Sequence, residues 1–308
     1  MKRAAVRQTQ SLLNLLGAGL SVDGLWGPKS QVAMDSLLEE YIRQAQYLAE
    51  SPVYGAYIWR LSKMADHEIV AACKAMNLSR LLVKIMNKHG RPMYAKRVPD
   101  LVKRCRDSGI AVWGWAYLDD KHAESDGVRF VELEQEYGLY GAVANMEREI
   151  VDGKNTREKE ADAEAIGSVL QQLETASLEF GFSSFRRRDY FPFPQELLED
   201  YTTKGLVCMP QCYNLRGEAA WSRVRECVQS WLAWDLQVRV TLGAFTPKSS
   251  RSGTFGSDLY GLRCGMLAVE QLHSVYPRLD NGFDLWALEQ IDPDMQKVVA
   301  DYTSTRAS

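Results

Sequence analysis

The residues with the clearest chemical potential lie together at the end of one apolar run. Residues Leu139 to Ile150 read LYGAVANMEREI, in which small and apolar side chains give way to Asn145, Glu147 and Glu149. In an extended strand alternate side chains share a face, so these three polar groups are expected to point the same way. Parallel strands of α/β enzymes present their working groups at their carboxyl ends. The pattern predicts that Glu147 is a catalytic acid there, and the alternative is a solvent-exposed strand end before a charged loop.

Polar and aromatic residues follow the other strand-like runs as well. We expect a group of them to share one site with Glu147, namely Lys84, Trp113, Trp115, Tyr117, Asp119, Gln211, Tyr213, Asn214, Trp286 and Glu289. Aromatic rings stack on sugar faces, while amides and carboxylates bond to hydroxyl groups. Carboxylates also supply the acid and base of glycoside hydrolysis. Each residue has an ordinary alternative: Trp113 or Trp115 can fill a core, and Asp119 can cap a helix.

Composition narrows the class of protein. The 308 residues carry a net charge of −3 with both signs interspersed, and 46% of them are hydrophobic, which allows a large core and gives no sign of a nucleic-acid partner. The six cysteines are scattered and the four histidines have no ligand spacing, so we expect no metal and no cofactor. Apolar runs of about 18 residues, which a membrane span needs, do not occur. Arg7, Gln8 and Gln10 interrupt the segment after the start, so we expect no signal peptide.

Apolar periodicity divides the chain into two regions. Residues 1–50 read as two helices around a Gly-rich and Pro-containing turn, and residues 54–308 alternate strand-like with helical runs. The predicted strands are Tyr54–Leu61, Arg80–Met86, Ile110–Tyr117, Leu139–Met146, Leu178–Ser184, Leu206–Tyr213, Gln237–Phe245 and Phe283–Glu289. The predicted helices are Asp66–Met76, Val98–Asp107, Ser125–Tyr137, Thr156–Ala176, Pro194–Tyr201, Ala219–Trp234, Asp258–Val275 and Pro293–Tyr302. This order, and a length close to the ~250 residues typical of the fold, predict a (β/α)8 TIM barrel preceded by a small all-α domain.

The first region resembles a known family. Gln10-Ser11-Leu12-Leu13-Asn14, the run from Val22 to Ser30 (VDGLWGPKS) and Ala33 resemble the helical peptidoglycan-binding domain of cell-wall hydrolases. Thr9 stands where that family has Leu, and Ser30 where it has Thr. The resemblance implies a wall-binding module at residues 1–50 that uses Asp23, Gly24, Trp26 and Gly27. The alternative is an ordinary two-helix turn.

The second region resembles barrel-type lysozymes and chitinases. Those families carry an acid glutamate at the end of the fourth strand in a D-x-E pattern, and Asn145-Met146-Glu147 occupies that place. Cys212-Tyr213-Asn214 behind Met209 is similar to the chitinase pattern that holds the acetamido group of the substrate. The resemblance implies Glu147 as general acid, with Asn145 and Tyr213 beside the N-acetyl group. Asn145 departs from the family's aspartate.

Together these features predict an enzyme that hydrolyses peptidoglycan glycan strands, as a muramidase or N-acetylglucosaminidase. Either Asp119 or Glu289 acts as nucleophile or base, or the acetamido group of the substrate attacks. A like charge close to Glu147, such as that of Glu149 or Asp119, keeps the acid protonated near neutral pH. The combination resembles phage endolysins, which implies a monomer that waits in the host cytoplasm until a holin releases it to the periplasm. Two alternatives remain: a non-catalytic wall-binding or virion protein, and a hydrolase of another N-acetylated polysaccharide.

Overall fold

A computed structural model describes residues 3, 6, 10, 20–23, 25–34, 52–87, 89–118, 122–147, 163–177, 179–190, 193–245 and 256–306. The chain separates into two compact units, Met1–Pro52 and Val53–Ser308. Among the helices in the described ranges, none combines the length and the apolar composition that crossing a membrane requires.

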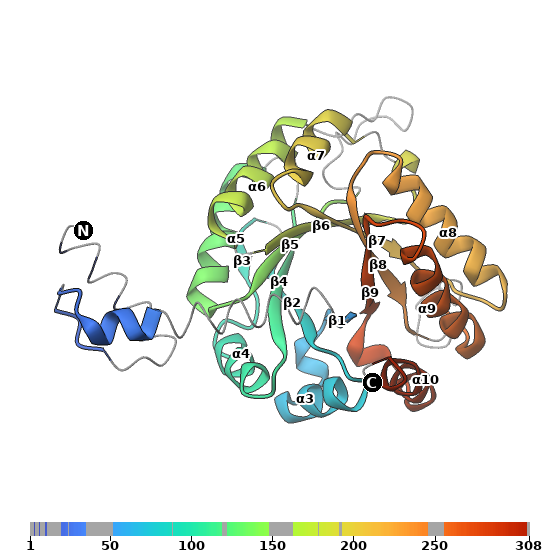
Figure 1. The fold of residues 1–308 in the computed structure, drawn as a ribbon, viewed down its shortest axis with the longest axis horizontal. Coiled ribbons are helices and arrows are strands. Elements are labelled where there is room, and N and C mark those ends of the chain that lie inside the picture. The colour runs from blue at the N-terminus through green and yellow to red at the C-terminus, as the bar shows by residue number, and fades with distance from the viewer. Residues whose placement is uncertain are drawn as a thin grey trace. The chain divides into compact units, whose positions relative to one another are not determined.

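The second unit is a closed (β/α)8 barrel, as predicted (Figure 1). Its parallel strands are β1 (Val53–Ile58), β2 (Arg80–Asn87), β4 (Ala111–Tyr117), β5 (Gly141–Asn145), β6 (Glu179–Phe185), β7 (Val207–Cys212), β8 (Gln237–Gly243) and β9 (Leu279–Trp286). Each strand pairs with the next, and β1 pairs with both β2 and β9, which closes the ring. Closure brings the carboxyl ends of all these strands to one mouth.

Helices form the outer layer of the barrel (Figure 1). They are α3 (Asp66–Ala75), α4 (Val98–Arg106), α5 (Ala123–Tyr137), α6 (Ala163–Ala176), α7 (Gln195–Thr202), α8 (Ala219–Leu232), α9 (Leu259–His273) and α10 (Pro293–Ser304). Capping explains where two of them start, because Asp258 accepts a hydrogen bond from the backbone of Gly261 and Asp292 from that of Met295. The apolar faces of the helices pack on the outward side chains of the strands and form the larger core.

Among the predicted strands, the last one differs most from the sequence prediction. The last strand was predicted at Phe283–Glu289, but β9 starts four residues earlier and ends at Trp286, so Glu289 lies in the 3-10 helix η6 (Leu288–Gln290). Asp280, Asn281 and Gly282 at the start of β9 have low strand propensity, and pairing with β1 and β8 overrides it. A short strand, β3 (Arg91–Pro92), pairs antiparallel to β2 and was not predicted.

A buried layer of charge lies inside the barrel, at the level of Arg80, the first residue of β2. Asp284 on β9 is fully buried and forms ion pairs with Arg80 on β2 and Arg239 on β8. The Nη1 atom of Arg239 also lies 2.6 Å from Oδ2 of Asp280. Gly55 leaves room for this layer, since a Cβ there would lie 2.2 Å from Oδ1 of Asp284. Inward-facing charges are therefore compensated at this level of the barrel.

An aromatic and apolar layer lies above the charged layer. Its buried members are Tyr57, Leu82, Trp113, Trp115, Val143 and Met209. They come from alternate positions of β1, β2, β4, β5 and β7, as inward-facing residues of a barrel must. Gly141 accommodates the bulk of Trp113, because a Cβ at residue 141 would lie 3.0 Å from the indole ring. This layer fills the centre of the barrel and supports the residues at its mouth.

The first unit is described in part, and its turn is held by polar contacts. The side-chain amide of Gln10 is buried and donates to Oδ1 of Asp23 (3.0 Å) and to the carbonyl of Leu25 (2.9 Å). Asp23 also accepts from the backbone N–H of Leu25, and the indole of Trp26 donates to Gln31. Residues 28–34 are helical, which agrees with the predicted second helix. Gly24 lies outside the described residues, and peptidoglycan binding by this unit stays a prediction.

Candidate active site

Glu147 lies just past the carboxyl end of β5, at the mouth of the barrel. The strand is buried throughout, and Glu147 is the half-buried residue that follows it. Asn145 is 4% exposed and donates a hydrogen bond from Nδ2 to Oε1 of Glu147 (3.1 Å). An apolar strand that ends in Asn-Met-Glu thus places a carboxyl group where solvent and a ligand can reach it.

Gln211 on β7 joins Glu147 to its neighbours. Its Nε2 atom donates to Oε1 of Glu147 (2.6 Å) and lies 3.0 Å from Oδ1 of Asn145 and 3.2 Å from Oγ of Ser183. An amide has two N–H groups, so these three acceptors share them. Gln211 was predicted to contact substrate. In the structure its amide donates to the carboxyl group of Glu147 and positions it. Ser183, on β6, was not among the predicted site residues, although its place two residues before the end of the strand could have indicated it.

Tyr213 and Asn214 follow β7 and hold polar atoms without partners. The Tyr213 hydroxyl and Oδ1 of Asn214 are buried, and neither has a hydrogen-bond partner within the described part of the chain. Burial, and next the negative charge of Glu147, raise the pKa of Tyr213 well above its ordinary value. The hydroxyl therefore stays protonated and can donate a hydrogen bond to a ligand beside Glu147.

Aromatic rings form the wall of the mouth. The half-buried Trp286 packs against Tyr57 (ring centroids 5.4 Å apart), Trp115 (5.4 Å) and Tyr213 (6.1 Å). Trp115 is almost fully buried, and its indole donates to the carbonyl of Ile58, so it supports the other rings from below. Half-buried rings at this level include Trp286 and Tyr117, together with Trp59, which was not among the predicted site residues.

Trp113 does not reach this mouth. Its ring is 1% exposed and packs on the guanidinium of Arg80 (4.7 Å) and on Tyr140 (6.2 Å), near the starts of the strands. The structure thus places Trp113 in the core, which was the alternative to a substrate contact. Trp113 and Trp115 both point into the barrel, but Trp113 comes two residues earlier on β4 and therefore lies deeper, further from the mouth.

Glu289 also has a different environment from the one predicted. Its carboxylate accepts hydrogen bonds from the backbone N–H groups of Trp59 (3.3 Å) and Arg60 (3.1 Å). Burial raises the pKa of Glu289 above its ordinary value. The carboxylate thus accepts hydrogen bonds from the backbone that follows the end of β1. Asp119 and Glu149, the other predicted carboxylates, lie outside the described residues.

Lys84 is a buried cation at the mouth. It is 5% exposed, and its Nζ lies 4.4 Å from the ring centre of Tyr117 and 5.2 Å from that of Trp115. Over the described ranges, no carboxylate forms an ion pair with it. Burial lowers the pKa of Lys84 to about 8. Two ring faces thus offset part of the cost of desolvating this ammonium group.

This environment predicts that Lys84→Met stabilises the protein. Lys84 carries its charge at pH 7 in a site that disfavours the charge, so the variant is expected to gain roughly 1–3 kcal/mol in free energy of unfolding. The folded-state pKa lies below the unfolded value of 10.5, so the wild type itself becomes more stable between about pH 8 and 10.5. The difference between variant and wild type should shrink over that range. Urea unfolding at pH 7 and pH 9.5 measures it, with the exposed Lys74→Met as control; equal gains from both variants would contradict the prediction.

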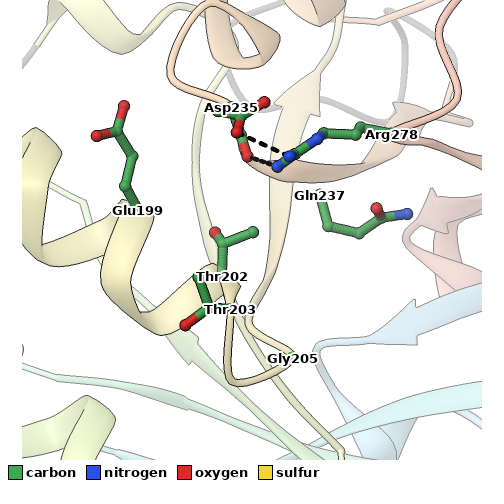
Figure 2. Close-up of a pocket in the computed structure, with 7 residues that line it drawn as sticks. All are labelled: Glu199, Thr202, Thr203, Gly205, Asp235, Gln237 and Arg278. Atoms are coloured by element: carbon green, nitrogen blue, oxygen red, sulfur yellow. Dashed lines mark hydrogen bonds and ion pairs between the residues drawn. The ribbon is translucent and has the colours of Figure 1, made fainter.

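A separate pocket of about 580 Å³ lies at the opposite end of the strands (Figure 2). It is lined by residues from the C-terminal part of α7 and by residues that precede or begin strands, among them Gly205 before β7, Asp235 before β8 and Arg278 before β9. Figure 2 shows Asp235 and Arg278 facing each other, and their ion pair measures 2.7 Å. Since these loops lie away from Glu147, this pocket is not part of the candidate active site.

Comparison with known proteins finds likeness at the level of fold. No family model and no curated protein matches the sequence. A solved chitinase from Bacteroides thetaiotaomicron superposes with a TM-score of 0.60 at 10% identity, over 84% of this chain and 98% of that one. ICChI chitinase from Ipomoea carnea gives 0.55 at 12% identity, over 81% and 99%. The spore cortex-lytic enzyme of Bacillus megaterium gives 0.53 at 9% identity, over 82% and 74%. The barrel is thus similar in fold to solved enzymes named as chitinases and as a cortex-lytic enzyme.

Proposed function

We propose that this protein is a glycoside hydrolase that cleaves the glycan strands of bacterial peptidoglycan. The observation that carries the proposal is the carboxyl group of Glu147, half-buried at the mouth of a (β/α)8 barrel and held by Asn145 and Gln211. Trp286 and Tyr117 are half-buried rings that pack on the aromatic layer of the barrel, and rings of this kind stack on sugar faces. Fold likeness to chitinases and to a cortex-lytic enzyme supports the same reaction class.

Glu147 acts as general acid in this proposal. It protonates the glycosidic oxygen as the bond to the anomeric carbon breaks, and it later takes a proton from the attacking water. We favour the acetamido oxygen of the substrate as nucleophile, because Asn145 supplies an amide where a nucleophile-orienting carboxylate is expected. The hydroxyl of Tyr213, for which the described part of the chain offers no hydrogen-bond partner, then steadies the acetamido group. If Asp119 supplies the nucleophile or base instead, a substrate without an N-acetyl group should also be cleaved.

Two features favour peptidoglycan over an uncharged polysaccharide. Lys84 places a buried positive charge at the mouth, and peptidoglycan carries carboxylates on its lactyl and peptide groups whereas chitin has none. The first unit carries the Asp23, Trp26 and Gly27 pattern that resembles a wall-binding module. A tethered module of that kind raises the local concentration of substrate without changing the chemistry. We extend the proposal to a monomeric endolysin that acts from the host cytoplasm after release to the periplasm.

Removal of one hydroxyl group tests the role of Tyr213. Tyr213→Phe is expected to slow glycan hydrolysis by roughly 10–100-fold, the value of one hydrogen bond to a charged group. Stability should be unchanged or slightly higher, because the variant deletes a buried hydroxyl that has no partner among the described residues. Turnover and melting temperature are compared with those of Tyr260→Phe, whose side chain is exposed. A variant with full activity would remove Tyr213 from the mechanism.

The substrate is tested directly by digesting purified sacculi and chitin oligomers side by side. Mass spectrometry of the products identifies the new reducing end, which distinguishes a muramidase from an N-acetylglucosaminidase. Cleavage of chitin oligomers alone would favour the hydrolase of another N-acetylated polysaccharide. Co-sedimentation with sacculi without any product would favour the non-catalytic wall-binding protein.

A further inference from the structure

Two histidines face each other at the same end of the barrel as Glu147. His89 follows β2, in the turn that leads to β3, and His122 precedes α5 after β4. Because β2 and β4 are neighbours in the sheet, the segments that follow them lie side by side. The two Nδ1 atoms are 3.1 Å apart, whereas the ring centres are 4.4 Å apart. The two rings therefore contact each other through their Nδ1 atoms.

This separation is the one that two ligands of a single metal ion require. Metal–imidazole bonds measure about 2.0–2.1 Å, which puts two nitrogens about 2.9 Å apart at a right angle and about 3.3 Å apart at a tetrahedral angle. The observed 3.1 Å lies between these values. An ion bound by both nitrogens would take the place of the direct contact between them.

The surrounding structure holds one histidine in place and leaves both accessible. The backbone N–H of His89 donates to Oδ2 of the buried Asp126 on α5 (3.2 Å), which ties the turn to the helix. Pairing of Asn87 with Arg91 anchors the same turn at its base. Both imidazoles are exposed to solvent, so an ion can reach them without opening the barrel.

We propose that His89 and His122 together bind one divalent transition-metal ion of the class that prefers imidazole, such as Zn²⁺, Ni²⁺ or Cu²⁺. Over the described residues, His, Cys, Asp and Glu side chains form no group of three that could hold a metal, so the proposal rests on the two imidazoles as ligands. The ion connects the turn after β2 to the start of α5 at the rim of the mouth. This inference is independent of the proposed hydrolase activity.

Calorimetric titration of the full, untagged chain with NiCl₂ tests the site. The wild type is expected to bind one ion per chain, and His89→Ala and His122→Ala are each expected to bind roughly tenfold or more weakly, because each loses the chelate. His67→Ala is the matched control, since His67 is an exposed histidine on α3 outside the pair. Absence of saturable binding by the wild type, or equal binding by all three variants, would overturn the proposal.

Proton NMR of the wild-type chain gives a second measurement of metal binding, and it does not depend on the folding of any variant. The sequence contains four histidines, so substoichiometric Ni²⁺ should broaden two sets of imidazole signals and leave two unchanged. The unchanged signals should be those of His67 and His273. Equal broadening of all four, or of none, would show that no paired site exists.

Discussion

Glu147→Gln is expected to reduce glycan hydrolysis by about 10²–10⁴-fold, the usual contribution of a positioned general acid. The substitution removes the proton that the leaving oxygen needs and keeps the size of the side chain. The amide oxygen at this position can still accept hydrogen bonds from Asn145 and Gln211, as Oε1 of Glu147 does. The hydrogen bonds at residue 147 should therefore persist, while protonation of the leaving oxygen is lost.

The matched control is Glu196→Gln, which makes the same change on an exposed position of α7. Release of reducing ends from sacculi measures activity, and circular dichroism with thermal melting measures folding. A folded Glu147→Gln variant with wild-type activity would show that Glu147 is not the acid. Loss of activity in both variants would point to a general effect of lost charge.

Asp284→Ala is expected to destabilise the protein by about 3–5 kcal/mol, the range seen when one partner of a buried ion pair is removed. Asp284 is fully buried between Arg80 and Arg239, so its loss leaves two cations facing each other inside the barrel. Burial and the neighbouring charge of Arg239 already lower the pKa of Arg80, and Asp284 opposes both effects. Without that carboxylate the repulsion between the two guanidinium groups has less to offset it.

Urea unfolding of Glu132→Ala provides the control for this effect. Glu132 pairs with Arg129 on the exposed face of α5, and such pairs contribute up to about 1 kcal/mol. A loss for Asp284→Ala no larger than that for Glu132→Ala would mean that the buried layer does not stabilise the fold. Activity of the folded fraction should be retained, since the ion-pair partners Arg80 and Arg239 lie near the starts of β2 and β8, whereas Glu147 lies past the end of β5.

Sequence periodicity was sufficient for the barrel because its signal is local and repeated. Buried parallel strands need continuous apolar runs, and surface helices need an apolar stripe, so each β-then-α unit could be read from its own residues. The start of β9 could not be read in this way. Asp280, Asn281 and Gly282 are poor strand formers, and they are extended because strands on both sides supply backbone partners.

The same distinction applies to the candidate site. The position of Glu147 at a strand end and the nearness of Asn145 follow from spacing along one strand, and both were predicted. The contact between Gln211 and Glu147 joins residues 64 positions apart, and the alternation of either strand does not reveal it. Trp113 and Glu289 were assigned to the mouth for their residue types, but depth along the strand and the free backbone at the end of β1 decide their environments.

The sequence by itself determined the kind of fold and the residue types available at each strand end, because both depend on local patterns of polarity. Only the tertiary structure decided which polar groups satisfy one another and which remain available to a ligand. Hydrogen bonds and ion pairs depend on distances across the barrel, and those distances are set by closure of the whole ring of strands. For that reason the Lys84 environment, the buried Asp284 layer and the His89–His122 pair emerged only from the assembled barrel.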